Sequence, residues 1–164
     1  MEKSMAVRAI FATDEAWGIG KNGTLPWPKN SADLKWFRQC TEGDIVMMGR
    51  KTWEDPKLPK PLPNRYNIVV SDRGLAANDT RPNMVIKRDH VKQYLNILDK
   101  DVWIIGGAQL LNNTLPYVEE VWVSRIQGIY DCDVRIGIDP FDFKLYESHE
   151  YFDQKLSIEK HRRY

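Results

Sequence analysis

The amino-acid sequence predicts a single α/β domain over residues 1–164, in which helices flank a central sheet. Short strand-like segments alternate with segments of helical periodicity along the chain, which is the pattern of this fold class. The segment 102–105 is apolar at every position, as expected for a central parallel strand that is covered on both faces. A length of 164 residues is enough to bury one hydrophobic core, so we expect one domain.

The chain opens with a β-compatible strand at 7–12. Residues 13–30 carry three glycines and two prolines, which predict a long irregular loop with no regular element. A loop of this length inside a compact domain is usually functional. Asn30 or Ser31 can cap a helix that runs to about Thr41, because apolar residues recur there at helical spacing.

The middle of the chain reads as strands separated by turns. A buried-type strand at 45–48 ends at Gly49, and a short helix follows near 51–53. The proline-dense segment 56–63 ends that helix. Further strands are predicted at 67–71 and 84–86.

The last part of the chain continues the alternation. Asp89 is expected to cap a helix that runs to Leu98, and the apolar strand 102–105 leads into two glycines and a helix at about 109–115. Residues 120–126 form a strand, and the tail 143–160 is expected to give a final antiparallel pair. Residues 161–164 are locally basic and predict a solvated terminus.

Composition argues against several classes of function. The formal net charge is +1, and basic and acidic residues are interspersed along the sequence. The sequence therefore predicts no broad region of positive potential that would bind nucleic acid. No apolar run is long enough to span a bilayer, and residues 1–4 are not followed by a signal-peptide core. Cys40 and Cys132 do not form a disulfide framework, which indicates a reducing, cytoplasmic setting. No residue cluster has metal-ligand spacing, so we expect no metal.

Asp33 is the most informative single residue. It lies four residues before Phe37, so its carboxylate shares a helix face with the apolar stripe. A first-turn aspartate can simply be favoured by the helix dipole. However, the preceding Leu25-Pro26-Trp27 offers apolar side chains that can exclude water, and a desolvated carboxylate has a raised pKa and can handle protons.

Three further features are candidate ligand contacts. Gly106-Gly107 places bare backbone at the end of a central strand, where α/β sheets bind ligands, although a simple strand-to-helix turn explains it equally well. The run 49–52 (Gly-Arg-Lys-Thr) can be an anion site or only solvated basic residues in a turn. Arg65 can offer a bidentate fork to a carboxylate, or be an ordinary surface arginine.

In their order along the chain, these motifs resemble the dihydrofolate reductase family from about Val7 to Asp133, with a weaker likeness to phage-encoded members. After Asp133 the match fades, and the C-terminal hairpin looks abbreviated. The motifs that carry the resemblance are Trp17-Gly18-Ile19-Gly20, Leu25-Pro26-Trp27, Asp33-Leu34-x-x-Phe37, Met48-Gly49-Arg50-Lys51-Thr52-Trp53-Glu54, Leu62-Pro63-x-Arg65-x-Asn67 and Ile105-Gly106-Gly107.

The resemblance implies a central mixed eight-stranded sheet and a monomeric enzyme that uses NADPH to reduce dihydrofolate for one-carbon and thymidylate metabolism. Asp33 would bind the pterin ring, assisted by Ser124 and a water near Trp27, and Leu25 would belong to the loop over the nicotinamide. The folate pocket would be lined by Ala12, Leu34, Phe37, Leu62 and Ile105, with Arg65 holding the glutamate tail. The cofactor would contact Ile19, Gly20, Gly49, Arg50, Lys51, Thr52, Ser71, Asp72, Arg73, Gly106, Gly107, Ala108, Gln109 and Leu110, with a cis peptide joining Gly106 and Gly107.

The sequence departs from the family pattern at two places, and two alternative functions remain open. Asp72 stands where a contact with the cofactor 2′-phosphate is often found, and Arg73 can compensate. The proline-rich segment 56–61 is longer than in compact bacterial members. The rivals are a reductase of the same general fold that acts on a pyrimidine intermediate of flavin synthesis, and a non-catalytic nucleotide-binding or virion structural module. Asp33, Phe37 and Arg65 favour a pterin with a glutamate tail over the first rival. The intact glycine- and proline-rich loop together with Asp33 argues against the second.

Overall fold

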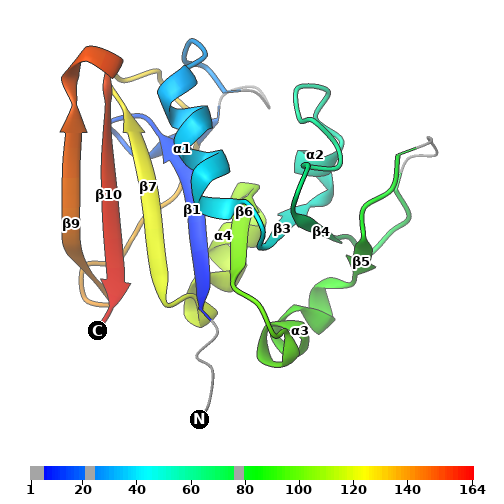
Figure 1. The fold of residues 1–164 in the computed structure, drawn as a ribbon. Helices are drawn as coiled ribbons and strands as arrows, with labels where there is room; N and C mark the ends of the chain where they lie inside the picture. Colours follow the sequence, from blue (N-terminus) through cyan, green and yellow to red (C-terminus); the bar gives the residue numbers. More distant parts are fainter. Residues whose placement is uncertain (1–5, 21–24, 76–79) are drawn as a thin grey trace.

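The computed structural model describes residues 6–20, 25–75 and 80–164. Over these residues the chain forms an eight-stranded mixed sheet of order β5-β4-β3-β6-β1-β7-β10-β9, flanked by helices (Figure 1). A separate two-stranded ladder is also present. The predicted α/β fold with a central eight-stranded sheet is therefore confirmed. The expectation for residues 1–4, and the part of the predicted loop at 21–24, lie outside the described residues.

The predicted strands and helices are found with small shifts in their ends. The sheet contains β1 (Val7–Thr13), β3 (Ile45–Gly49), β4 (Tyr66–Val70), β5 (Met84–Ile86), β6 (Val102–Gly106), β7 (Glu120–Ile126), β9 (Phe143–Tyr151) and β10 (Leu156–Arg163). The helices are α1 (Ser31–Thr41), α2 (Arg50–Trp53), α3 (Val91–Ile97) and α4 (Ala108–Thr114), with 3₁₀ turns η1 (Arg88–His90), η2 (Leu115–Tyr117) and η3 (Phe152–Gln154).

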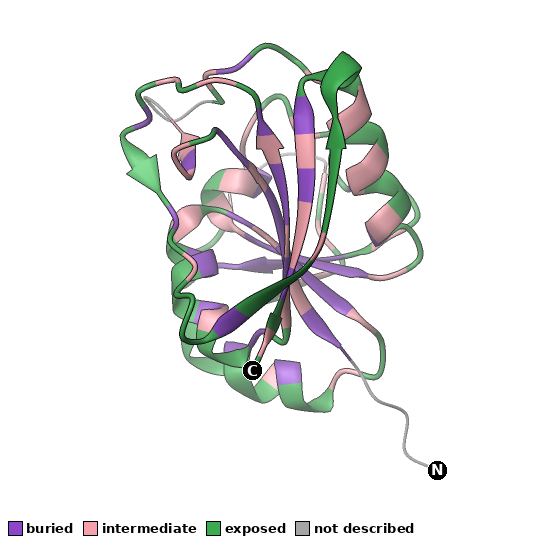
Figure 2. Cartoon of the chain, turned by 90° about the vertical axis from the view of Figure 1, so that its left-hand side faces the viewer, coloured by how far each residue is buried: buried purple, intermediate pink, exposed green. Residues whose placement is uncertain are grey.

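Alternating side chains of the central strands enter two separate cores. Along β3, Ile45 and Met47 pack with residues of α3 and α4, whereas Val46 and Met48 pack with residues of α1 and α2. Both faces of the central sheet are therefore covered, which explains the continuous apolar runs in the sequence. Figure 2 shows the consequence, since the central strands are largely buried and the edge strand β9 is largely exposed.

Strand direction places the candidate residues at one edge. β1 pairs in parallel with β6 and β7, and β3 pairs in parallel with β4 and β6. The carboxyl ends of these strands therefore meet at the same edge of the sheet, which is where open α/β sheets bind ligands. The register sets Met48 of β3 opposite Gly106 of β6, so the two glycine turns that follow these strands lie side by side.

The prediction that residues 13–30 hold no regular element was wrong. Gly18–Gly20 form a short strand, β2, that pairs antiparallel with β8 (Val134–Arg135). Backbone hydrogen bonds extend this ladder, from the Asp133 N–H to the Gly20 carbonyl at 3.0 Å and from the Ile136 N–H to the Trp17 carbonyl at 3.1 Å. The glycines of β2 do not favour a strand by themselves, but pairing with β8, more than 100 residues away in sequence, makes this segment a strand.

The predicted cap at Asp89 was also wrong. Asp89 lies inside η1, and α3 begins at Val91 with no side-chain cap. The carboxylate of Asp72 does the capping instead, because it accepts hydrogen bonds from the Arg88 N–H at 3.0 Å and from Arg88 Nε at 2.7 Å. The free N–H group at the start of this turn is thus satisfied from a different segment.

The expectation of a solvated terminus at 161–164 was wrong for 161–163, which continue a strand, whereas Tyr164 is exposed. β9 and β10 have nine and eight residues, and β10 extends to Arg163. His161 is buried within that strand. Arg163 donates hydrogen bonds from Nε to the Val118 carbonyl at 2.9 Å and from its terminal nitrogen to the Leu115 carbonyl. Capping of these two carbonyls ties the end of the chain to the turn before β7.

Candidate active site

The first turn of α1 holds Asp33 over the sheet. Asn30 caps this helix, because its Oδ1 accepts the Asp33 N–H at 3.0 Å, and its Nδ2 donates to the Gln154 carbonyl at 2.7 Å. The cap fixes where α1 begins and ties that end to the hairpin of β9 and β10. The sequence offers Asn30 or Ser31 as the cap, and in the structure the cap is Asn30.

Asp33 faces the strands β1 and β7. Ser124 of β7 pairs with Ala12 of β1, and the Ser124 hydroxyl lies close enough to the Asp33 carboxyl to lower its pKa. Trp27 is buried in a cluster against which Ala12 and Ala32, the neighbour of Asp33, also pack. The structure thus brings together Asp33, Ser124, Trp27 and Ala12, as the sequence analysis expected. Leu25 and Leu34 are instead about half exposed.

Burial raises the pKa of the Asp33 carboxyl above its ordinary value, and the nearby Ser124 hydroxyl offsets only part of that rise. The Ser124 Oγ is fully buried and has no partner in hydrogen-bond geometry within the described part of the chain. We take the two observations together to mean that the hydroxyl lies close to the carboxyl without a well-formed bond in this state. A buried hydroxyl without a partner is costly, which suits a group that a ligand or water satisfies.

The raised pKa has a consequence for stability. A carboxyl whose pKa is raised by folding destabilises the folded state when ionised, and this cost vanishes as the pH falls below the ordinary value of 3.8. We therefore expect Asp33→Asn to raise the free energy of unfolding at pH 7 by about 0.5 to 2 kcal/mol, as is typical of single stabilising substitutions. Urea unfolding at several pH values measures this gain, which should disappear in acid.

Asp72 provides the opposite control for this prediction. Hydrogen bonds from the Arg88 N–H and side chain hold the pKa of the exposed Asp72 carboxyl below its usual value. Its ionised form therefore contributes stability above pH 3.8 that is lost as the pH falls further. Asp72→Asn should destabilise the protein at pH 7, and a loss of stability in Asp33→Asn as well would contradict the desolvation argument.

Arg65 is anchored at the other end of α1. Its Nε donates to the Pro63 carbonyl at 2.9 Å, its Nη1 donates to Thr41 Oγ1 at 3.1 Å, and its guanidinium lies 6.0 Å from the ring centre of Phe37. Burial lowers the pKa of the Arg65 guanidinium, and an arginine side chain stays charged in proteins at physiological pH. Arg65 is therefore an oriented cation with donors left over, and not a freely moving surface side chain.

The segment that carries Arg65 is itself fixed. The buried Asn67 side chain accepts the Leu62 N–H at 2.9 Å and donates to the carbonyls of Leu62 and Arg65, both at 3.0 Å. Leu62 is buried next to Phe37 in the core beneath α1. Asp33 and the anchor Thr41 are eight positions apart on the helix, which corresponds to about 12 Å along its axis. An elongated ligand can therefore reach from Asp33 to Arg65 along α1.

The second half of the site lies where β3 and β6 end. The peptide between Gly106 and Gly107 is cis, as the resemblance implies, and Gly106 has a φ of +136°, which favours glycine. An added Cβ at Gly107 would lie 3.7 Å from Thr52 Oγ1, and one at Gly49 would lie 3.7 Å from the Gly107 nitrogen. These are ordinary van der Waals contacts, so the described residues leave the backbone at 49 and 107 open to close approach by a ligand.

The remaining candidates around this edge differ in how free they are. Three of the candidates are exposed to solvent, namely Lys51, Arg73 and Gln109. Five are half-buried, namely Ile19, Gly20, Thr52, Ile105 and Ala108. Arg50 is paired with Glu54 at 2.7 Å, the Ser71 hydroxyl is bonded to the Arg73 backbone, and Leu110 is buried in the core with Leu111. Asp72 points to Arg88, so its charge is neutralised away from Arg73.

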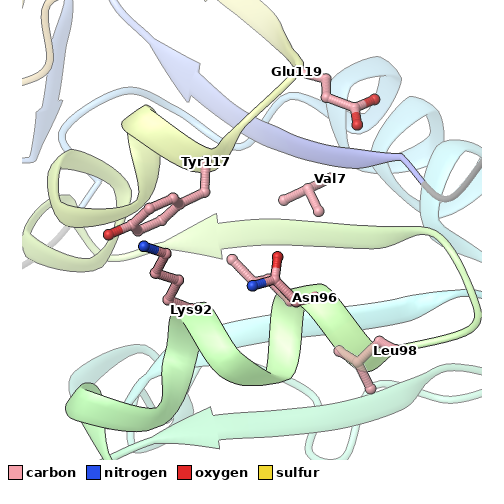
Figure 3. Close-up of a pocket in the computed structure, with 7 residues that line it drawn as sticks. Val7, Lys92, Asn96, Leu98, Tyr117 and Glu119 are labelled. Carbon is pink, nitrogen blue, oxygen red and sulfur yellow. The ribbon is translucent and has the colours of Figure 1, made fainter.

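Sequence reasoning missed two residues that shape the site. Thr41 anchors Arg65, and the buried Asp14 joins the glycine-rich segment to the connection after β7. Only the position of Asp14, directly after a strand and before a glycine-rich loop, gave a sequence signal. A cavity of about 240 Å³ lies at the opposite edge of the sheet, lined by Val7, Lys92 and Tyr117 among others, and holds none of the candidate residues (Figure 3).

No group of His, Cys, Asp or Glu side chains that could hold a metal occurs in the ranges 6–20, 25–75 and 80–164. The helices within those ranges are also too short or too polar to cross a membrane.

The fold and site have the features of an α/β enzyme class that binds its ligands at the carboxyl edge of a largely parallel sheet, next to a carboxyl group whose pKa is raised by burial. The family model for dihydrofolate reductase matches residues 6–162. The chain therefore belongs to the dihydrofolate reductase family. The match continues well past Asp133, so the expectation that it fades there was wrong.

Individual relatives agree with this assignment. The dihydrofolate reductase of Bacillus subtilis is 34% identical over 144 residues, which cover 86% of this chain and 82% of the relative. That of Haemophilus influenzae is 37% identical over 131 residues, covering 79% of this chain and 77% of the relative. Among solved structures, dihydrofolate reductase from Enterococcus faecalis complexed with NADP(H) and RAB-propyl matches with a TM-score of 0.82 and 25% identity, covering 96% of both chains.

Proposed function

We propose that the chain catalyses the NADPH-dependent reduction of 7,8-dihydrofolate to 5,6,7,8-tetrahydrofolate, with Asp33 binding the pterin and promoting its protonation. The observation that carries the proposal is Asp33, a carboxyl on the first turn of α1 whose pKa is raised by burial and which faces the buried Ser124 hydroxyl of β7. Family membership and the similarity to an NADP(H) complex support the same activity. We further propose that residues 1–164 act as one domain in a monomeric, cytoplasmic enzyme that supplies one-carbon and thymidylate metabolism.

The reaction adds a hydride to the imine carbon of the pterin and a proton to the neighbouring nitrogen. The bound cofactor supplies the hydride. Asp33 accepts hydrogen bonds from the amino group and ring nitrogen of the pterin, and in doing so fixes the ring over β1 and β7. Because its pKa is raised, Asp33 can hold a proton near the reacting nitrogen, directly or through a water ordered near Trp27.

The apolar surroundings complete the substrate site. Ala12, Phe37 and Ile105 line the side of the pocket towards the sheet, and the exposed Leu25 and Leu34 cover the bound ring from outside. An apolar pocket with a few fixed polar groups is the usual form of a small-molecule site. Arg65 binds the α-carboxylate of the glutamate tail with the donors that Pro63 and Thr41 leave free.

The residues at the ends of β3 and β6 fit the cofactor. The glycine backbone at 49, 106 and 107 allows close approach of a ligand, and Lys51, Thr52 and Arg50 stand next to it with positive charge and a hydroxyl. Ile19 and Gly20 contact the nicotinamide from the other side. Leu110 acts only indirectly in this proposal, because its side chain is in the core.

Cofactor choice follows from the charges at this edge. Lys51 and Arg73 attract the extra phosphate of NADPH, with a smaller contribution from Arg50, whose charge is shared with Glu54. Asp72 is held by Arg88 and does not repel the phosphate. We expect kcat/KM with NADPH to exceed that with NADH by at least about tenfold, or about 1.4 kcal/mol. Steady-state rates with each cofactor test this, and equal use of both would show that Asp72 faces the ribose.

A spectrophotometric assay of NADPH oxidation tests the proposed function. The purified protein should oxidise NADPH when 7,8-dihydrofolate is added. Turnover of an amino-pyrimidine that carries a ribosylamino group, in place of dihydrofolate, would favour the rival reductase of flavin synthesis. Binding of NADPH without any turnover would favour a non-catalytic module.

A further inference from the structure

The carboxylate of Asp14 joins two segments that are distant in sequence. Its Oδ1 accepts the N–H groups of Ala16 at 2.9 Å and Gly18 at 2.8 Å, and its Oδ2 accepts the N–H of Tyr130 at 3.0 Å and lies 3.5 Å from Cys132 Sγ. Asp14 is only 1% exposed. A single buried side chain thus satisfies backbone groups on both sides of the β2–β8 ladder.

Other contacts hold the same two segments together. The Glu15 N–H donates to the Gly128 carbonyl at 3.0 Å, and the Gly128 N–H donates to Glu15 Oε2 at 2.8 Å. Arg135 donates to the Ala16 carbonyl at 3.0 Å. These contacts are at the surface, where each hydrogen bond contributes little, whereas those of Asp14 are shielded from water.

The chemistry of this junction requires an ionised carboxylate. Burial raises the pKa of Asp14, but the hydrogen bonds from Tyr130, Gly18 and Ala16 lower it further, so that its pKa lies below the ordinary value. Every neighbour that it contacts here is a donor. An amide at position 14 would present an NH₂ group to one of these donors, leaving at least one buried N–H without a partner.

The contact between Gly18 and Cys132 fixes the spacing of the two segments. A Cβ placed on Gly18 would overlap the Cβ and Sγ of Cys132. Only glycine fits at position 18 while Cys132, which also contacts Asp14, keeps its place. The backbone of β2, which carries Ile19 and Gly20, is therefore packed directly against the Cys132 side chain.

We propose that Asp14 is a positioning residue that clamps the segment 14–20 to the segment 128–136 and so holds Ile19 and Gly20 in place against the nicotinamide of NADPH. This inference rests on the proposed function, which puts the nicotinamide at these two residues. Asp14 touches no substrate in this arrangement. It acts through the backbone of β2.

The test compares Asp14→Asn with Asp101→Asn. Asp101 also joins two segments, because it accepts the Ala6 N–H at 3.1 Å and pairs with Arg8 at 3.3 Å, but it lies at the amino ends of β1 and β6, away from the site. Calorimetric titration with NADPH should show a Kd at least about tenfold higher in Asp14→Asn and changed by less than about twofold in Asp101→Asn. The KM for dihydrofolate should change by less than about twofold in both variants.

A second measurement does not depend on the proposed reaction. Amide hydrogen exchange of Asp14→Asn should accelerate at Ala16, Gly18 and Tyr130, while the central strands of the sheet keep their protection. Unchanged exchange at these amides would overturn the clamp. Faster exchange with a parent-like Kd for NADPH would overturn the positioning role. A parent protein that fails to bind NADPH would instead refute the proposed function.

If Asp14→Asn does not fold, the Gly18 contact gives an independent answer. Gly18→Ala should weaken NADPH binding by at least about fivefold, because the new methyl group pushes β2 away from Cys132. Adding Cys132→Gly should restore most of the affinity. Parent-like binding in Gly18→Ala, or no restoration in the double variant, would show that the position of β2 does not control the cofactor.

Discussion

Replacing Asp33 with asparagine should lower kcat at pH 7 by about 10² to 10⁴, the usual contribution of a positioned acid or base. Asparagine keeps the size of the side chain and the hydrogen bond of its N–H to Asn30, but it cannot supply or order a proton in the same way. NADPH affinity should change little, since Asp33 lies on α1 and the cofactor residues lie at the ends of β3 and β6. Steady-state kinetics and NADPH titration of the same preparation measure both effects.

Asp44→Asn is the matched control for this variant. Asp44 is another half-buried aspartate near α1, and its carboxylate accepts the Trp103 Nε1–H at 3.0 Å, a hydrogen bond that asparagine can keep. Its kcat should stay within about threefold of the parent, a change of less than 1 kcal/mol. An Asp33→Asn protein that is folded by circular dichroism and turns over at a near-parent rate would rule out the assigned role of Asp33.

Replacing Arg65 with alanine should weaken dihydrofolate binding far more than NADPH binding. The side chain is already oriented by Pro63 and Thr41, so little entropy is lost when its remaining donors bind a carboxylate. Loss of a charge-assisted bidentate contact costs on the order of 1.5 to 3 kcal/mol, or roughly a 10- to 150-fold increase in KM. Measuring KM for both substrates in the same variant separates a tail contact from general damage.

Arg38→Ala controls for the loss of one positive charge near this end of α1. Arg38 is largely exposed and lies 3.9 Å from Glu42, so its removal should leave the dihydrofolate KM within about twofold of the parent. If Arg38→Ala and Arg65→Ala raised the KM equally, the effect would be long-range attraction and not a fork at Arg65. A parent-like KM in Arg65→Ala would remove that residue from the site.

Features set by neighbouring residues could be predicted from the sequence. The apolar runs of β3 and β6 followed by glycine predicted central strands that end at a ligand edge, and Asn30 was one of two predicted caps for the helix that carries Asp33. Both depend on local propensity and periodicity.

Features set by distant residues could not be predicted. β2 exists because residues 133–136 pair with it, and the Asp14 clamp needs an amide 116 positions away. The turn at Arg88 is capped by Asp72 from another segment, so local reasoning chose the wrong aspartate. The basic C-terminal residues looked like solvated charges, but Arg163 binds two carbonyls that only the folded chain brings near it. In each case a long-range contact outweighed the local signal.

The measurement that tests the central claim most directly is single-turnover hydride transfer, followed across pH for the parent and Asp33→Asn. If Asp33 promotes protonation, acid should relieve the deficit of the variant, because more dihydrofolate then arrives already protonated from solvent. The rate of Asp33→Asn should therefore climb as the pH drops below neutral while the rate of the parent levels off. A large deficit that does not change with pH would contradict the claim and leave Asp33 with a binding role only.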